Sequence, residues 1–260
     1  MRDLLLLPVA ASGRAAEVDQ MILIVHGVML AALIVWGVFF VVPLVRYRKS
    51  KSPTADYRGL RSKLPYVLVL AMVAIESVLL VGFSLPFWER EVTTLPNGDV
   101  VDVRVVAQQF GWNIHYPGPD GRYGQSRPEL VDEQANPLGL VPEDDAGKDD
   151  VVLWNQLHLP VGKTALIHLT SRDVVHGFSV PEFRVKQDAI PGIRVPVHFV
   201  PTMTSADFKQ VTGNPDREFE IVCAQLCGLT HFSMKGLVYV ETPEEFEAWL
   251  AKKTEERSQT

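Results

Sequence analysis

Four potential metal ligands lie within twelve residues near the C-terminal end of this chain. The segment CAQLCGLTHFSM, residues 223–234, contains Cys223, Cys227, His231 and Met234. Two thiolates, an imidazole and a thioether form a soft donor set, and soft sulfur ligands favour copper over magnesium, calcium or manganese. The sequence therefore predicts a copper site in a loop that follows the strand EFEIV.

Three other kinds of site would use only part of this cluster. A Cys223–Cys227 disulfide suits an exported domain but leaves His231 and Met234 without a role. A structural zinc site prefers cysteine and histidine in a closed tetrahedron, in which methionine is a poor ligand. A mononuclear blue copper site takes one cysteine, two histidines and an axial methionine, which leaves one cysteine over.

Two cysteines suit two metal ions bridged by two sulfur atoms, and such a centre needs one more strong donor. A further histidine would serve, although a histidine in a loop is by itself weak support for a ligand. The candidates outside the loop are His115, His158, His168, His176 and His198.

Two long apolar runs precede the rest of the chain and predict a transmembrane hairpin. Residues 21–45 contain no Lys, Arg, Asp or Glu, and residues 64–88 contain only Glu76. A helix of either length reaches about 37 Å, enough to cross a hydrocarbon core of roughly 30 Å. The connecting residues 46–63 are basic, and short basic loops stay cytoplasmic. We therefore expect residues 1–20 to form an uncleaved extracytoplasmic tail and residues 21–88 to form the hairpin.

Residues 89–260 predict an extracytoplasmic all-β domain, a sandwich or a barrel. Short alternating runs are separated by turn clusters, and the strand candidates are 101–106, 150–154, 164–169, 193–200, 218–222 and 235–240. Thr242, Pro243 and Glu245 then form a helix start with an N-cap and a capping glutamate. Phe246, Trp249 and Leu250 follow at helical spacing, which predicts a short C-terminal helix packed on the sheet.

The net charge of −6 hides an uneven distribution along the chain. Residues 1–88 carry nine basic and five acidic side chains, a balance of +4, whereas residues 89–260 carry 16 and 26, a balance of −10. An acidic domain is a poor binder of phosphate backbones, so we expect no nucleic-acid partner. Residues 129–150 hold eight acidic side chains against Lys148. They form either a solvated loop or a surface that steers a basic partner.

Two long motifs in this order, behind a two-span hairpin, resemble subunit II of haem-copper cytochrome c oxidases. That family's metal loop has the form C-x-E-x-C-G-x-x-H-x-x-M, and residues 223–234 match it except at Gln225. Its upstream element has the form D-V-x-H-x-[FW]-x-V-P, then K-x-D-A-x-P-G. Residues 173–181 and 186–192 match this element. The resemblance covers about residues 18–250.

The resemblance implies a cupredoxin-like Greek-key barrel that holds a binuclear copper centre, known as CuA. Cys223 and Cys227 would bridge the two copper ions, and His176 and His231 would each bind one of them. Met234 would be a weak ligand of one copper. The backbone carbonyl of residue 225 would bind the other, a role that does not depend on the side chain.

Two departures from the family pattern change what is expected. Gln225 replaces a glutamate that helps to hold an interface magnesium ion, and a neutral amide is a weaker ligand for a hard cation. The expectation of a magnesium ion is weakened accordingly. The family's Q-W-x-W run is here Gln109-Phe110-Gly111-Trp112. Phe110 therefore stands where the first tryptophan receives the electron, and Trp112 is the second candidate or a core residue.

By this resemblance, the copper pair accepts electrons from a c-type cytochrome and passes them to haem in subunit I. Subunit I then reduces oxygen to water with proton translocation, and subunit III completes the set of expected partners. The expected location is the inner membrane of a bacterial-type cell, with the copper domain outside. The alternative is a membrane-anchored copper carrier, which would bind copper reversibly and would not purify with a haem subunit.

Overall fold

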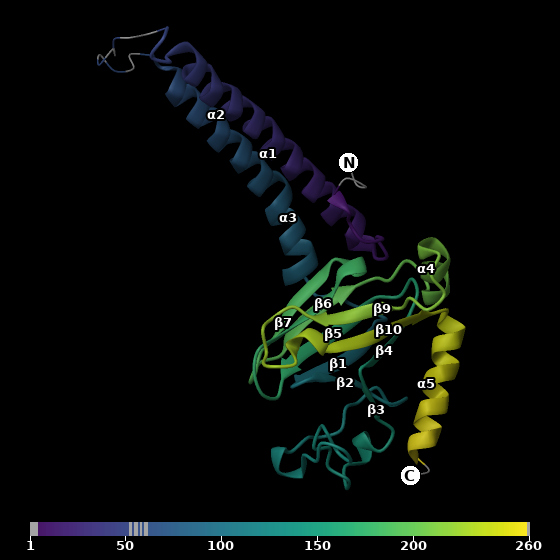
Figure 1. Cartoon of the computed structure of the whole chain (residues 1–260). Helices are drawn as coiled ribbons and strands as arrows, with labels where there is room; N and C mark the ends of the chain where they lie inside the picture. Colours follow the sequence, from purple (N-terminus) through teal and green to yellow (C-terminus); the bar gives the residue numbers. More distant parts are fainter. Residues whose placement is uncertain (1–4, 52–53, 55–56, 58, 60–61, 259–260) are drawn as a thin grey trace. The chain divides into compact units, whose positions relative to one another are not determined.

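The computed structural model describes residues 5–51, 54, 57, 59 and 62–258. The chain divides into two compact units, which are described separately (Figure 1). The helical unit comprises Met1–Leu7 and Glu17–Thr93, and the β unit comprises Pro8–Ala16 and Thr94–Thr260. Asp56, Arg58 and Arg61 of the predicted cytoplasmic loop lie outside the described residues.

Two long apolar helices form the helical unit. The first is α1, Gly13–Arg46; the second runs from Leu64 to Thr93 and includes α2, Leu64–Leu79, and α3, Leu85–Trp88. One π-helical turn interrupts the second helix just before Pro86, which has no N–H to donate to the preceding turn, and another forms its last segment. No residue of the apolar windows in these described helices is buried, and both helices can span a membrane.

The predicted intramembrane carboxylate lies beside a groove between the two helices. The groove has a volume of about 570 Å³ and includes Trp36, Phe39 and Glu76 in its lining. Apart from Glu76, its lining consists of apolar side chains. Apolar side chains that face outward all round a helix are typical of segments solvated by lipid, so the chain is anchored in a membrane.

Ten strands form two five-stranded sheets in the β unit (Figure 1). The first sheet has the order β3-β2-β1-β5-β8, and the second has the order β4-β10-β9-β6-β7. The strands are β1, Val101–Gln108; β2, Gly111–Tyr116; β3, Val151–Trp154; β4, Gln156–Pro160; β5, Ala165–Ser171; β6, His176–Val180; β7, Val185–Ala189; β8, Val195–Phe199; β9, Phe219–Cys223; β10, Lys235–Glu241. The pairs β1–β5 and β4–β10 are parallel, and the other pairs are antiparallel.

The two sheets enclose one hydrophobic core, so the predicted fold class, a membrane hairpin with a cupredoxin-like β domain, is confirmed. Alternate residues of β1, such as Val103 and Val105, are fully buried, as expected for a strand with one face on a core. Phe178 and Phe219 from the second sheet fill the same core. The packed sandwich supplies a rigid frame for the loops at its ends.

The C-terminal helix forms where the sequence predicts it. Helix α5, Pro243–Ser258, begins with a capping box in which Thr242 Oγ1 accepts from the Glu245 amide and Glu245 Oε2 accepts from the Thr242 amide. The ring of Trp249 stacks on that of His158 with centroids 4.0 Å apart. The helix therefore packs on the second sheet through its aromatic side chains.

The start of the chain differs from the predicted tail. Helix α1 begins at Gly13, earlier than the predicted Met21, and the preceding segment belongs to the β unit. The Ala11 amide donates to the Glu182 carbonyl at 2.9 Å, and Ser12 Oγ donates to the Phe183 carbonyl at 2.7 Å. Small residues allow this close approach, a contact that apolar periodicity does not predict.

The outer face of the first sheet carries a covered polar cluster. His115 Nε2 lies 2.6 Å from Asp150 Oδ2, and both side chains are almost completely buried. The Gly124 amide also donates to Asp150 Oδ2, at 2.9 Å. Tyr123 donates from its hydroxyl to Asp102 Oδ1 at 2.5 Å. These bonds attach the segment between β2 and β3 to the sheet.

Candidate metal centre

The predicted ligands come from two neighbouring strands of the second sheet and the loop that follows one of them. His176 is the first residue of β6 and Cys223 is the last residue of β9, and these strands pair with Phe178 opposite Cys223. The loop returns to the sheet through a bond from the Cys223 amide to the Met234 carbonyl at 3.2 Å. Residues 47 positions apart in sequence are therefore brought to one end of the sandwich.

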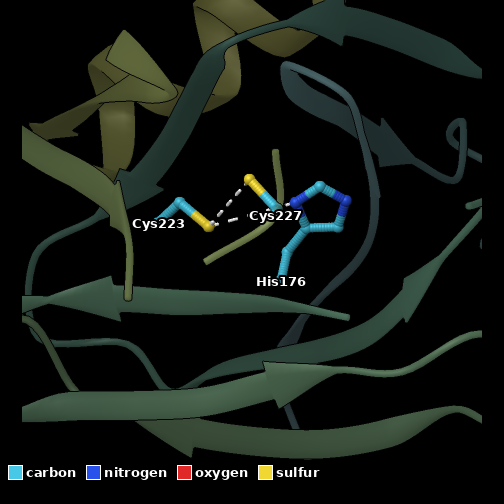
Figure 2. A group of neighbouring side chains, drawn as sticks. All are labelled: His176, Cys223 and Cys227. Atoms are coloured by element: carbon cyan, nitrogen blue, oxygen red, sulfur yellow. Dashed lines mark hydrogen bonds between the residues drawn. The ribbon is translucent and has the colours of Figure 1, made fainter. Parts of the chain in front are cut away.

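Figure 2 shows the two thiols and the first imidazole facing one another. The sulfur atoms of Cys223 and Cys227 are free thiols 3.7 Å apart. His176 Nδ1 lies 3.9 Å from Cys223 Sγ, and the three ligand atoms all lie within 4.8 Å of one another. Among the described residues, these three side chains are the one group of histidine, cysteine and acidic residues close enough together to hold a metal ion.

The remaining predicted donors surround the same thiols. Cys227 Sγ lies 3.5 Å from His231 Nδ1 and 3.7 Å from Met234 Sδ. The carbonyl oxygen of Gln225 lies 3.2 Å from Cys223 Sγ. The structure therefore gathers all six predicted donor groups around two adjacent sulfur atoms.

Burial of the centre affects how its thiols ionise. Cys227 is 4% exposed, and His176 and Met234 are also buried. Burial, together with the neighbouring Cys223 thiol, raises the pKa of Cys227 to about 11 in the metal-free protein. Metal binding at neutral pH must therefore displace a proton from this thiol.

An aspartate fixes the orientation of the buried imidazole. His176 Nε2 lies 2.8 Å from Asp173 Oδ1, so the other ring nitrogen, Nδ1, faces the sulfur atoms. Burial raises the pKa of Asp173, but hydrogen bonds from His176 and from the Gln109 and Val174 amides outweigh it and hold that pKa below its usual range. An ionised carboxylate here keeps the proton on Nε2 and leaves Nδ1 free as a ligand.

The loop lies against the turn between β1 and β2. Gln109 Nε2 donates to the Cys227 carbonyl at 2.6 Å. Gly228 has φ +140°, and a Cβ there would lie 2.8 Å from Gln109 Nε2 and 3.1 Å from the Phe110 ring. The β1–β2 turn is thus in direct contact with the ligand loop. Sequence reasoning missed the role of Gln109, because nothing in its type or position indicated a bond to the loop.

The two aromatic candidates occupy different environments. Phe110 is partly exposed and contacts the ligand loop at Gly228. Trp112 is fully buried in the core, with its ring edge-on to His176 at a centroid distance of 6.2 Å. Among the other candidate histidines, His115, His158 and His168 pair with Asp150, Glu241 and Asp102, away from the sulfur atoms. His198 lies in β8 of the first sheet.

The side chain of Gln225 is bound within the β unit. Its Nε2 lies 3.2 Å from Asp188 Oδ1 and 3.1 Å from Asp188 Oδ2. An amide therefore satisfies the carboxylate that lies beside the ligand loop.

Comparisons with known proteins show the family of this chain. Residues 139–241 match the family model described as cytochrome c oxidase subunit II, periplasmic domain. The alternative cytochrome c oxidase subunit 2 of Bradyrhizobium diazoefficiens is 35% identical over 207 residues, which are 79% of this chain and 69% of that protein. Cytochrome c oxidase subunit 2 of Thermostichus vulcanus is 29% identical, over 94% of this chain and 77% of that protein.

A solved structure is also similar, the periplasmic domain of subunit II of cytochrome oxidase from Bradyrhizobium japonicum. It is 25% identical with a TM-score of 0.43, and the match covers 63% of this chain and 99% of that one. Two helices that can span a membrane, followed by a cupredoxin-like β domain, define the class of protein. This chain belongs to the cytochrome c oxidase subunit II family, and one related protein is a haem-copper oxidase subunit 2 from Aeropyrum pernix.

Proposed function

We propose that this chain is the electron-accepting subunit of a haem-copper cytochrome c oxidase and holds a binuclear copper centre. The observation that carries the proposal is the pair of free thiols 3.7 Å apart, with His176 beside one and His231 beside the other. A mononuclear site has no use for the second thiol, and a disulfide has no use for the imidazoles. The donor set is soft, as suits copper, and His176, Cys227 and Met234 are buried.

Each donor has a separate task in this proposal. Cys223 and Cys227 supply bridging thiolates, and His176 and His231 each supply one nitrogen. Met234 and the Gln225 carbonyl supply weak donors on the two sides. When bound, a sulfur-bridged copper pair supplies reversible one-electron chemistry.

The surrounding residues hold this donor set in place. Asp173 keeps the His176 ring turned toward the thiols, and Gln109 fixes the ligand loop at the Cys227 carbonyl. Gly177 lets the loop approach β6, because a Cβ there would lie 2.9 Å from the Ala224 carbonyl carbon. A rigid donor set changes little between two oxidation states, which favours fast electron transfer.

The partners follow from the same proposal. A c-type cytochrome gives electrons to this chain, and haem in subunit I receives them, with subunit III in the same complex. Oxygen reduction and proton translocation belong to subunit I. The acidic residues 129–150 favour a basic donor by complementary charge. Donor kinetics should weaken as salt rises, and salt-independent kinetics would contradict electrostatic steering.

The Gln225 amide takes the place of an interface magnesium ion in this proposal. Gln225 already donates to Asp188, so this carboxylate has a neutral hydrogen-bond partner without a metal. We expect Gln225→Glu to place two carboxylates side by side and to create affinity for Mn²⁺ in the assembled oxidase. Electron paramagnetic resonance of bound Mn²⁺ measures this, and strong Mn²⁺ binding by the unsubstituted chain would contradict it.

We also infer that the β unit and both termini lie outside the cytoplasm, in a bacterial-type inner membrane. Arg46, Arg48, Lys49, Lys51 and Lys63 flank or occupy the connection between the two helices, and basic short loops remain cytoplasmic. A cysteine placed at Ser50 in a Cys223→Ser, Cys227→Ser background should react with a membrane-impermeant maleimide only after the membrane is opened. Labelling of intact cells would reverse the topology.

The decisive experiment is spectroscopy of the copper-loaded full chain in detergent. A mixed-valence binuclear signal in electron paramagnetic resonance, with near-infrared absorption, is expected; a single-copper signal would overturn the proposal. The full chain is needed because Pro8–Ala16 packs within the β unit. Cys223→Ser should abolish the binuclear signal and leave the far-ultraviolet circular dichroism unchanged.

The same preparation separates an oxidase subunit from a copper carrier. An oxidase subunit purifies from the native membrane with haem and retains copper during dialysis against a mild chelator. A carrier loses copper to the chelator and purifies without haem.

A further inference from the structure

We propose that a cavity on the outer face of the second sheet binds an arginine side chain that a partner protein presents. The cavity has a volume of about 650 Å³. Glu220 and Val222 of β9 and Leu237 of β10 line it, and Leu237 pairs with Glu220. Strand β6 begins at His176 and ends just before the turn that contains Glu182, another lining residue. The cavity and the metal centre therefore lie at opposite ends of β6, and the proposal does not rest on copper.

Two glutamates of the lining have a buried oxygen atom with no hydrogen-bond partner among the described residues. Glu182 Oε1 lies 3.7 Å from Arg217 Nη2, whereas its Oε2 is buried and has no such partner. Glu218 Oε1 pairs with Lys209 of α4, Ser205–Thr212, and its Oε2 is likewise buried without a partner. The Glu182 side chain is 9% exposed. A buried carboxylate oxygen without a donor is costly, so each of these two atoms marks a position for a donor from outside the chain.

The charges around the cavity leave an excess of one negative charge. Four acidic side chains and one basic side chain line it: Glu182, Asp216, Glu218, Glu220 and Arg217. Lys209 and Lys235 pair with two of these glutamates. Four carboxylates against three cations match a ligand with a single positive charge. A divalent metal ion fits less well, because among the described residues these carboxylates do not form a group close enough to hold one.

The lining favours arginine over other cations. Apolar surface from Pro181, Val222 and Leu237 lies beside the carboxylates, which suits the aliphatic stem of a long basic side chain. A planar guanidinium carries five N–H donors and can bond to two carboxylates at once, whereas an ammonium group has three donors around one point. A bare ion would leave most of the 650 Å³ to water.

The edge of the cavity indicates a protein as the source of the arginine. The Arg217 side chain is 54% exposed and that of Glu220 is 43% exposed, so a polar, accessible rim surrounds the buried Glu182. Protein interfaces commonly combine a polar rim with a buried pocket, and arginine is enriched among the residues that dominate their affinity. The partner is therefore a protein segment that projects one arginine into this pocket.

The first test measures binding of a capped glycine–arginine–glycine tripeptide to the metal-free full chain in nanodiscs. Nuclear magnetic resonance of the methyl groups of Val222 and Leu237 reports binding inside the cavity. The matched control peptide contains citrulline, which is neutral and nearly the same shape as arginine. The arginine peptide should bind at least about tenfold more tightly, because charge-assisted hydrogen bonds are the stronger ones. Equal binding of the two peptides would overturn the proposal, as would tighter binding of Ca²⁺ with the same methyl shifts.

Substitutions at the carboxylates separate this cavity from the general acidity of the β unit. Glu182→Gln should weaken binding of the arginine peptide about tenfold, and Glu218→Gln should also weaken it, because each variant loses a charged acceptor. The control is Glu129→Gln, since Glu129 is exposed on another segment, and it should bind as the parent does. Circular dichroism checks the fold of each variant, and Glu218→Gln remains a test if Glu182→Gln does not fold. Equal binding by all three variants would refute the site.

A photo-crosslinker tests whether the arginine comes from a protein. Benzoylphenylalanine introduced at position 237, in cells that assemble the native membrane complex, should capture a peptide with an arginine at or beside the attachment point. Mass spectrometry identifies this peptide, and Glu182→Gln should reduce its yield. A captured peptide without arginine, or no captured peptide, would overturn a protein partner and leave a free guanidinium compound as the ligand.

Discussion

Two buried imidazoles of the β unit are each paired with an aspartate, and only one of them faces sulfur. His176 bonds to Asp173, which is 30% exposed, and its Nδ1 lies 3.2 Å from Met234 Sδ. His115 bonds to Asp150, whose side chain is completely buried, and its ring stands edge-on to Tyr123. In our proposal the same pair of residue types thus serves as a metal ligand with its support in one place, whereas in the other it is an internal tether.

This difference shows what decides the role of a histidine–carboxylate pair: the groups around the imidazole nitrogen that does not contact the carboxylate. At the metal centre the carboxylate is accessible and the free nitrogen faces soft donors. At the outer face of the first sheet the aspartate instead binds a loop amide and a histidine. Substitution of Asp150 should therefore affect mainly stability, whereas substitution of Asp173 should affect mainly metal affinity.

The largest effect is expected from Asp150→Ala. It removes the partner of the buried His115 and of the Gly124 amide, and breaking such a buried pair costs about 3 kcal/mol. Urea unfolding of the full chain, followed by tryptophan fluorescence, measures the loss. The control is Asp145→Ala, because the Asp145 side chain is 90% exposed. Equal stabilities of the two variants would show that the pair does not tether the segment.

The second prediction concerns metal affinity. Asp173→Asn should lower copper affinity about tenfold, because substituting a hydrogen-bond partner of a metal-ligating histidine typically costs that much or more. Its effect on the stability of the metal-free chain should be small, since the carboxylate is partly exposed. Competition with a copper chelator measures the affinity. Asp150→Asn is the cross-control and should leave copper affinity unchanged; a loss there would remove the distinction between the two pairs.

The third prediction tests the contact between the ligand loop and the β1–β2 turn. Gly228→Ala should destabilise the β unit by about 2 kcal/mol, because φ is +140° and the added methyl group meets Gln109 and Phe110. Gly162 is the matched control: its φ is +78°, but nothing lies within 4 Å of its Cβ position. Gly162→Ala should therefore cost less and leave the copper spectrum unchanged. A spectrum equally unaffected by both substitutions would contradict the contact.

The smallest effect is expected at Asp102, in the polar cluster of the first sheet. Burial raises its pKa, but hydrogen bonds from His168 and Tyr123 outweigh this and hold the pKa below the usual value. Its contribution to stability is therefore present above the unfolded-state pKa and is lost as pH falls through the lowered folded-state pKa. Asp102→Asn should lower stability near pH 7 by about 0.5 kcal/mol, since the side chain is partly exposed.

Urea unfolding at pH 7 and at pH 3 measures the Asp102 effect. The difference between variant and parent should shrink at the lower pH, because the stabilisation is progressively lost once the pH falls below the unfolded-state pKa. A difference that grows on acidification would mean that Asp102 destabilises the folded state at neutral pH.

The strands show how much of the fold can be predicted from local sequence. Six predicted strands are present, at β1, β3, β5, β8, β9 and β10, because they alternate or are strongly apolar. β2 was missed because its buried residues include Asn113 and His115, which disrupt the apolar alternation, and β4 was missed because QLHLP contains a buried histidine and ends in proline. β6 was missed because His176 marked a loop motif, and β7 because VKQDA is polar. Polar strands become recognisable only when the segment or strand that covers them is known.

The metal centre shows the same limit. Cys223, Cys227, His231 and Met234 lie in one short loop, so their spacing alone placed them together. His176 joins them because β6 pairs with β9, and nothing in local periodicity specifies that pairing. The family motif, not local periodicity, assigned His176 to the centre. The hydrogen bond from Gln109 to the Cys227 carbonyl had no signal in the sequence.

Local residue types and spacing by themselves determined the soft donor set, the two membrane-spanning helices and the capped helix at the C-terminal end. These depend on ligand chemistry, on apolar length and on interactions between residues a few positions apart. Tertiary structure alone decided that Pro8–Ala16 joins the β unit, that Gln109 binds the ligand loop, and that Trp154 covers Gly111. The physical reason is strand register: a period of two specifies a face of a strand, but only long-range pairing specifies its neighbours.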